Sequence, residues 1–289
     1  MSSYFDDVTE TLAPLPSLKE VIERHGLLAK KSLGQNFILD QNVTDRIVRT
    51  AGSLKEKIVM EVGPGPGGLT RSILEANPAR VIAVEKDRRC IDALKELNPH
   101  YPQLLILHED ALAFDMMDSA LINLTNPVKI IANLPYNVGT PLLIKWLQTL
   151  TVIESMTLMF QKEVAERITA KPKTKAYGRL SILVQWLCEA DSCFDLPPTV
   201  FVPQPKVTSS VVHITPRKEP LAKIKFQTME ALTQATFGQR RKMIKTSLKN
   251  IIEDPLPLLK AARIDPNKRP EELTVNNFCK LAELLEESC

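Results

Sequence analysis

The chain has 289 residues, of which 44% are hydrophobic and 25% are charged, with a net charge of +3. The length suits two compact domains, and no apolar stretch approaches the roughly 20 residues of a membrane-spanning helix. The first 18 residues contain Asp6, Asp7 and Glu10 but no basic residue, the reverse of a secretion or transit signal. We therefore expect a cytoplasmic protein that needs no membrane.

Cysteine and histidine spacing gives no metal or disulfide signature. None of the five cysteines forms a C-x-x-C pair, and the four histidines are scattered. We therefore predict reduced cysteines with packing roles and no metal site. Charge is divided unevenly, because residues 217–289 carry a net +4 and residues 1–216 a net −1. The C-terminal part is thus the better candidate for contact with a polyanion.

Two helices are predicted near the N-terminus. Ser17 followed by Glu20 is a capping box, which opens a helix that we expect to end near Gly26. Asp40 is a candidate N-cap for a second helix, with Val43 among the residues of its apolar stripe. The first 16 residues carry no recognisable motif.

Short apolar runs then alternate with segments long enough for helices. They span residues 57–63, 80–85, 104–110, 128–136 and 155–160. This alternation predicts an α/β fold with a parallel sheet and right-handed crossovers.

Two later runs have a different pattern. Residues 179–190 predict a helix that leads into a strand, and residues 206–216 predict a strand that closes the sheet at an edge. Between them, four prolines within residues 196–205 exclude a helix or a central strand, so we expect an ordered connection.

Beyond residue 217 the strand pattern disappears. Ile244, Leu248, Ile251 and Ile252 have helical spacing, and Thr274 is a candidate N-cap for a last helix. We predict three parts: an N-terminal arm with the start of a helix (1–24), an α/β domain (25–216) and a small all-helical domain (217–289).

A glycine loop follows the first predicted strand of the sheet. Gly63, Gly65 and Gly68 let the backbone turn sharply and approach a ligand. Glu85 ends the next strand, 22 residues after Gly63, where a carboxylate can accept both hydroxyls of a ribose. The spacing also fits G-x-G-x-x-G, so an NAD-dependent enzyme competes with an S-adenosylmethionine enzyme. Glu61 and two loop prolines favour the latter, which has no pyrophosphate to hold.

Asp110 follows the third strand, where a second carboxylate could accept from an adenine amino group. The structural alternative for Asp110 is a turn or helix N-cap residue.

The fourth strand ends in Asn133, Leu134, Pro135 and Tyr136. An adenine N6 is a poor nucleophile because its lone pair is delocalised into the ring. The Asn133 side-chain oxygen and the Leu134 carbonyl could accept its two hydrogens and favour a pyramidal nitrogen. Pro135 would stiffen the turn, and Tyr136 would stack on the base. The structural alternative is a strand end with a turn and a half-buried tyrosine.

Nine motifs together resemble the bacterial small-subunit ribosomal RNA adenine dimethyltransferases, the KsgA type, from about residue 25 onward: KKSLGQNFILD, EVGPGPGGLT, VEKD, HEDAL, NLPYN, QKEVAERI, YGRLSILVQ, FVPQPKVTSSVV and FGQRRKMIKTSL. The resemblance implies a class I, Rossmann-like methyltransferase domain with a seven-stranded mixed sheet plus a small helical domain. It also implies N6,N6-dimethylation of two adjacent adenosines near the 3′ end of small-subunit (16S) rRNA, during subunit assembly. The implied cofactor contacts are Asn36, Ile38, Gly63, Gly65, Glu85, Asp110 and Asn133.

Such an enzyme must hold RNA while a base leaves the stack. The first candidate surface contains Arg240, Arg241, Lys242 and Lys245, within residues 231–252, which hold no acidic residue. We expect Arg240, Arg241 and Lys245 to share a helix face. A second surface contains Lys171 and Lys173. The structural alternative for both is an ordinary solvated face.

Two other functions stay open from the sequence. One is a non-catalytic factor that binds immature 30S-type subunits, and the other is a methylase of large-subunit rRNA. We expect a monomer.

Overall fold

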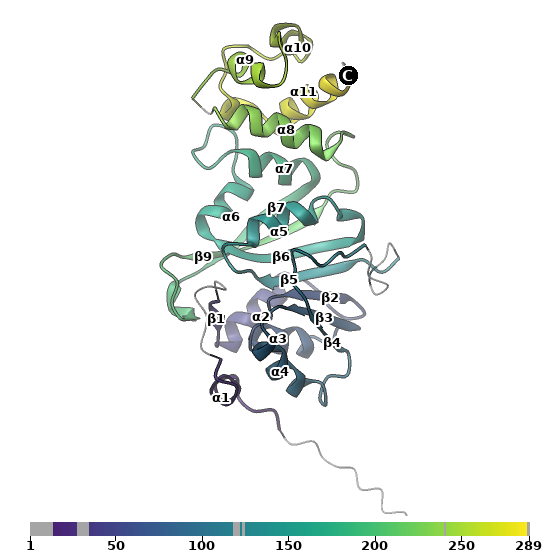
Figure 1. Cartoon of the computed structure of the whole chain (residues 1–289), viewed down its shortest axis with the longest axis vertical. Helices are drawn as coiled ribbons and strands as arrows, with labels where there is room; N and C mark the ends of the chain where they lie inside the picture. Colours follow the sequence, from purple (N-terminus) through teal and green to yellow (C-terminus); the bar gives the residue numbers. More distant parts are fainter. Residues whose placement is uncertain (1–13, 28–34, 118–121, 123–124, 240, 288–289) are drawn as a thin grey trace, which may run out of the picture.

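The computed structural model describes residues 14–27, 35–117, 122, 125–239 and 241–287. Figure 1 shows an elongated molecule with the central sheet in the middle, the C-terminal helices at one end and α1 (Leu18–Arg24) toward the other. Within this described part of the chain, no helix is both long and apolar enough to cross a membrane.

The sheet has seven strands in the order β4-β3-β2-β5-β6-β9-β7. The five strands from β4 to β6 run parallel, and β9 is antiparallel to both of its neighbours. The predicted α/β class and seven-stranded mixed sheet are therefore confirmed. The strands are β2 (Ile58–Val62), β3 (Arg80–Glu85), β4 (Leu104–His108), β5 (Val128–Asn133), β6 (Ile153–Gln161), β7 (Cys188–Leu196) and β9 (Ser209–Pro216).

The prediction that residues 206–216 form the edge strand is wrong. Ser209–Pro216 of this run form β9, which lies between β6 and β7, and β7 is the edge. Burial gives the reason, because Ser209 through Val212 are all buried whereas most residues of β7 are not. A strand paired on both sides needs apolar or hydrogen-bonded side chains on both faces.

Helices cover both faces of the sheet. Helices α2 (Gln41–Thr50), α3 (Gly68–Glu75) and α4 (Arg88–Leu94) cover one face, and α5 (Gly139–Trp146), α6 (Lys162–Thr169) and α7 (Arg179–Leu187) cover the other. Alternation along β3 places Val81 and Ala83 in the first core and Ile82 and Val84 in the second. The continuous apolar runs of the sequence are thus strands buried on both faces.

Both predicted N-caps near the N-terminus are confirmed. The Ser17 amide donates to a Glu20 carboxylate oxygen (2.7 Å) and the Glu20 amide to the Ser17 hydroxyl (3.3 Å). The Asn42 amide donates to Asp40 Oδ1 (2.9 Å) at the start of α2. Helix α1 packs Val21 against α4, so this leader helix is tied to the sheet.

After β9 ends at Pro216, the described chain is helical. Helices α8 (Phe226–Phe237) and α11 (Val275–Glu287) pack against α7, and α9 (Ile244–Ser247) and α10 (Pro255–Ala261) lie beyond them. As predicted, Thr274 caps α11, with its hydroxyl accepting from the Asn277 amide (3.2 Å). One apolar core runs from the sheet through α7 into α8 and α11, so packing sets the orientation of the helical region.

The basic stretch is not part of a continuous helix, contrary to our expectation. Helix α8 ends at Phe237, and a Cβ at Gly238 would lie 2.9 Å from the Gln234 carbonyl oxygen. The chain turns before α9 begins at Ile244. Of the apolar residues with helical spacing, Ile244 and Leu248 are buried, whereas Ile251 is exposed.

A two-stranded sheet was not predicted. Strand β1 (Phe37–Ile38) pairs antiparallel with β8 (Phe201–Val202), within the proline-rich connection. The connection is therefore ordered, as expected, and it holds the segment around Phe37.

Candidate active site

The glycine loop between β2 and α3 lies against β1. Gly65 has a φ of +56°, and a Cβ there would lie 3.0 Å from the Phe37 ring. A Cβ on Gly68 would lie 2.6 Å from the Ile38 carbonyl oxygen. These contacts leave no room for a side chain, so glycine allows the loop and β1 to enclose a ligand site together.

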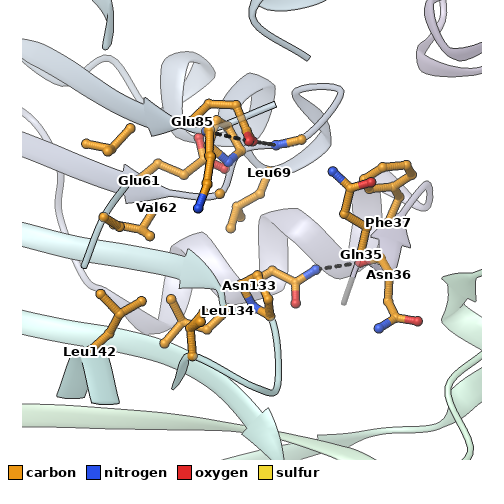
Figure 2. Close-up of a pocket in the computed structure, with 18 of the residues that line it drawn as sticks. Gln35, Asn36, Phe37, Glu61, Val62, Leu69, Glu85, Asn133, Leu134 and Leu142 are labelled. Carbon is orange, nitrogen blue, oxygen red and sulfur yellow. Dashed lines mark hydrogen bonds between the residues drawn. The ribbon is translucent and has the colours of Figure 1, made fainter. Parts of the chain in front are cut away.

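A cavity of about 300 Å³ opens at the carboxyl edge of the sheet, the usual binding edge of an open α/β fold. Figure 2 shows Glu85 and Asn133 on opposite sides of it, on β3 and β5. The cavity is lined by every residue predicted for the cofactor: Asn36, Ile38, Gly63, Gly65, Glu85, Asp110 and Asn133.

Glu85 is held in place by backbone amides. Its Oε2 accepts from the Gly65 amide (3.0 Å), and its Oε1 accepts from the amides of Lys86 and Asp87 (2.7 Å each). Burial raises the pKa of this carboxyl group, and the three amide bonds oppose the shift. The two oxygens are thus fixed before any ligand arrives.

Glu61 is a second acid of the cavity, on β2 two residues before Gly63. Its side chain is buried, and Oε2 has no hydrogen-bond partner within the described residues. Burial raises its pKa to about 8, and the nearby Glu85 carboxylate adds to the shift. A buried acid with one unpartnered oxygen fits a ligand that brings a positive charge.

Asp110 makes the turn interaction of its structural alternative and also lines the cavity. Its Oδ1 accepts from the Leu112 amide (3.0 Å), which is the turn interaction, while Oδ2 accepts from Lys86 Nζ (2.7 Å). The hydrogen bond from Lys86 lowers the pKa of this carboxyl group. Asp110 is therefore an ionised acceptor at the cavity wall.

The amide of Asn133 has a defined orientation. Its Nδ2 donates to the Asn36 carbonyl oxygen (2.9 Å), which Figure 2 shows as a dashed line. Because the NH₂ group is used in this way, the side-chain oxygen remains as the acceptor of the Asn133 side chain. The segment that contains β1 thus orients the predicted base-binding group.

A tight turn follows, at residues 136–138. The Pro135 carbonyl oxygen accepts from the amides of Val138 and Gly139 (3.1 Å each). Leu134 and Pro135 line the cavity. Tyr136 does not line it, and its hydroxyl lies 2.6 Å from Ser209 Oγ. Tyr136 is half-buried, and burial raises the pKa of its hydroxyl.

Several lining residues were not singled out from the sequence. Phe37 and Lys86 lie beside predicted residues, so their neighbours in sequence were the available signal. Leu112, Val138 and Leu142 come from a loop and from the start of α5. They resemble ordinary apolar residues in the sequence, and only the fold brings them to the cavity.

The basic residues proposed for RNA lie at the helical end of the molecule. Lys171, Lys173, Arg241 and Lys242 are exposed, and Lys245 is half-buried, with Nζ donating to Asn267 Oδ1 (2.8 Å). Arg240 lies outside the described residues.

One segment, residues 265–272, lies beside both basic groups. The amide of Lys173 donates to the Glu271 carbonyl oxygen (2.7 Å), and the amide of Lys245 donates to the Pro266 carbonyl oxygen (3.3 Å). Lys268 and Arg269 of this segment are exposed. Lys173 of one predicted surface and Lys245 of the other therefore both contact residues 265–272, which the sequence did not indicate.

The structure shows free cysteines at the described positions, with Cys193 exposed and Cys90, Cys188 and Cys279 buried. Among the described residues, no three His, Cys, Asp or Glu side chains form a cluster that could hold a metal ion.

The mixed sheet with an antiparallel β9, the glycine loop and the paired acids of the cavity define a class I, Rossmann-like methyltransferase, whose cofactor is S-adenosylmethionine. Residues 26–287 match the family model described as ribosomal RNA adenine dimethylase. The chain belongs to this family.

Relatives and solved structures agree with this assignment. A protein named ribosomal RNA small subunit methyltransferase A from Allorhizobium ampelinum is 53% identical over 275 residues, covering 94% of this chain and 98% of that protein. The protein of that name from Xanthobacter autotrophicus is 52% identical and covers 94% of each chain. A dimethyladenosine transferase from Plasmodium falciparum has a TM-score of 0.74 at 26% identity, covering 87% of this chain and 97% of that one. The 23S rRNA methyltransferase ErmE shares the fold, with a TM-score of 0.66, 24% identity and coverage of 87% and 100%.

The predicted family, enzyme class and cofactor are confirmed, and the NAD-dependent alternative is excluded. The geometry of the cavity fits this cofactor. The fixed Glu85 oxygens suit a pair of ribose hydroxyls, and the unpartnered Glu61 oxygen suits a cationic group in an otherwise buried place.

Proposed function

We propose that this enzyme transfers methyl groups to N6 of two adjacent adenosines near the 3′ end of small-subunit rRNA, two to each, within an immature 30S-type subunit. The observation that carries the proposal is the oriented Asn133 amide at the edge of the cavity. The names of the relatives from Allorhizobium and Xanthobacter support the small subunit as the substrate.

Each cofactor-contacting residue has a separate task in the proposed complex. Glu85 binds the ribose hydroxyls with its two fixed oxygens, and Asp110 accepts from the adenine amino group. The backbone of Gly63 and Gly65 forms the floor, and Asn36 and Ile38 form a wall. When bound, S-adenosylmethionine supplies an electrophilic methyl group on a sulfonium.

The target adenine is activated by hydrogen-bond acceptors rather than by a general base that removes its proton. The Asn133 oxygen and the Leu134 carbonyl accept the two N6 hydrogens, which favours a pyramidal nitrogen with a directed lone pair. An amide cannot remove a proton from a neutral amine, so the N6 proton leaves after methyl transfer, when the nitrogen is cationic. Pro135 stiffens the turn, and Tyr136 stacks on the base face, which contributes roughly 1–3 kcal/mol.

The RNA lies across the helical end in this proposal. Arg241, Lys242 and Lys245 contact phosphates beside the 265–272 segment, as do Lys171 and Lys173. Arg240, from the same basic stretch of the sequence, is assigned the same role. The backbone bonds of Lys173 and Lys245 to that segment support a single surface. Long basic side chains at an exposed site suit a phosphate backbone, which is bound largely by charge.

We further infer that residues 25–216 act as the methyltransferase domain and residues 217–289 as the RNA-binding domain, preceded by the arm at 1–24. The protein would work as a monomer in the cytoplasm, where ribosomal subunits are assembled.

The decisive experiment measures methyl transfer from labelled S-adenosylmethionine into unmethylated small ribosomal subunits, with mass mapping of the product. Large subunits and the Asn133→Ala variant are the controls. We expect dimethyladenosine at two adjacent 3′-terminal positions, and none with either control. Label in large-subunit rRNA alone would favour the large-subunit methylase. Binding to small subunits without transfer would favour the non-catalytic assembly factor.

A further inference from the structure

Tyr136 is held at both ends. Its backbone is fixed by the turn in which the Pro135 carbonyl accepts from two amides. Its hydroxyl lies 2.6 Å from the hydroxyl of Ser209, a residue 73 positions later in the chain. A phenol ring is rigid, so fixing the backbone and the hydroxyl together fixes the position of the ring and the direction of its long axis.

The position of Ser209 is fixed by strand pairing and burial. It is the first residue of β9, it pairs with Gln161 at the end of β6, and its side chain is fully buried. Burial excludes Ser209 itself from contact with a large substrate such as RNA. In the described part of the chain, its hydroxyl has Tyr136 as its side-chain partner and can act on a substrate through that residue.

The neighbouring serine has a different partner. The Ser210 hydroxyl donates to Asp195 Oδ1 (2.6 Å) on β7, and Asp195 also accepts from Lys162 Nζ (2.6 Å). Ser209 and Ser210 are both buried on the same strand. Only the first of them contacts Tyr136 in the described structure, so the second is a natural control.

The protonation state of Tyr136 keeps the bond intact across the working pH range. Burial raises the pKa of its hydroxyl, so the phenol stays neutral near neutral pH. A neutral hydroxyl can donate to Ser209 or accept from it.

We propose that Ser209 is a positioning residue, whose hydroxyl fixes the Tyr136 ring so that the ring face is ready to stack on the target adenine. This inference rests on the proposed function, in which Tyr136 contacts the base. Without the bond, the half-buried ring can rotate away from the base, and the reacting N6 loses its alignment with the acceptors of Asn133 and Leu134. Small losses of alignment at a reacting atom reduce the rate of transfer.

A double-mutant cycle tests the proposal. Single-turnover transfer rates are measured with small subunits for the wild type, Ser209→Ala, Tyr136→Phe and the double variant. Each single variant removes the same hydrogen bond and should slow transfer by about five- to tenfold, the effect of one ordinary hydrogen bond. The double variant should be no slower than either single variant, because the bond can be lost only once.

Ser210→Ala serves as the matched control. It removes a buried hydroxyl from the same strand without touching Tyr136, so its transfer rate should stay within about twofold of the wild type. Its effect should add to that of Tyr136→Phe. The affinity for S-adenosylmethionine should be unchanged in every variant, since neither Ser209 nor Tyr136 lines the cavity.

The NMR resonance of the Tyr136 ring gives a second measurement. The chain has four tyrosines, so the NMR spectrum of ring-labelled tyrosine is simple, and Tyr136→Phe identifies one resonance by its loss. Ser209→Ala should shift that resonance and leave the other three in place, which also shows that the variant folds.

Each outcome decides the matter. Slower transfer that is not additive, together with the shifted resonance, supports the positioning role. Additive losses, an unchanged rate in Ser209→Ala or an unshifted resonance overturn it while the enzyme remains an adenine methyltransferase. A wild-type enzyme that transfers no methyl group to rRNA overturns the proposed function, and with it this inference.

Discussion

The cofactor cavity and the basic surface are built in opposite ways. In the cavity, Glu85 and Asn133 are each fixed by hydrogen bonds to backbone groups of a neighbouring segment. On the basic surface, Arg241 and Lys242 are exposed side chains on a turn between two helices. Single substitutions should therefore disable the cavity, whereas the surface should lose affinity gradually, one charge at a time.

Asn133→Ala should have the largest effect. It removes an acceptor that acts mainly in the transition state, so transfer should fall by about 10²–10³-fold, while affinity for S-adenosylmethionine stays within about tenfold. Transfer rates and calorimetric titration measure the two quantities. Asn98→Ala, at an exposed asparagine, is the control and should behave as the wild type. Loss of cofactor binding alone would contradict the role given to Asn133.

Glu85→Gln should come next. Glutamine has a single carbonyl oxygen, and its NH₂ group would face one of the amide donors that Glu85 now accepts from. A charge-assisted hydrogen bond is then either replaced by a neutral one or lost. Cofactor binding should therefore weaken by about 10- to 100-fold. Glu253→Gln at an exposed site is the matched control. Equal affinities for the two variants would argue against Glu85 as the ribose ligand.

Glu61 should make the stability of the cofactor-free protein depend on pH. Its pKa is about 8 when folded and about 4.3 when unfolded. Between these values the folded protein holds a proton that the unfolded chain has released. The free energy of unfolding should therefore fall as pH rises from about 5 to 8, by roughly 1.4 kcal/mol per pH unit from this group.

Urea unfolding of the wild type and of Glu61→Gln at several pH values checks this expectation. In Glu61→Gln, the free energy of unfolding should no longer fall with pH by this amount. In Glu253→Gln, it should fall as in the wild type. Parallel pH profiles for the wild type and Glu61→Gln would show that Glu61 is ionised in the folded protein.

The basic surface should give the smallest change per residue. Arg241→Ala combined with Lys242→Ala should weaken RNA binding and reduce the slope of log affinity against log salt by about 1.4 to 1.8 for two lost phosphate contacts. Lys19→Ala with Lys55→Ala removes the same charge from exposed sites at the other end of the chain. An unchanged slope in the first pair would exclude these residues from the RNA surface.

Much of the fold could be read from local patterns. The continuous apolar runs gave the central strands, because a strand buried on both faces carries apolar residues throughout. Caps such as Ser17 and Asp40 were found because their hydrogen bonds join residues only two or three positions apart. The place of β9 inside the sheet could not be read in this way, since its pairing with β7 depends on residues about 20 positions away.

The residues expected to contact the cofactor were also accessible from the sequence. Gly65, Glu85 and Asn133 lie at strand ends, and the carboxyl ends of parallel strands meet at one edge. Their hydrogen bonds were not accessible. The Asn133 bond to Asn36 spans 97 positions, and β1, which lines the cavity, pairs with β8 more than 160 residues later in the chain.

By itself, the sequence determined the α/β class, the cofactor-binding edge and the chemical groups at that edge, because periodicity and motif spacing are local properties of the chain. Tertiary structure alone decided which way the Asn133 amide points, what holds the Tyr136 ring and which basic segments lie beside residues 265–272. These features depend on contacts between residues far apart in the sequence, and such contacts exist only once the sheet and the helical region have packed together.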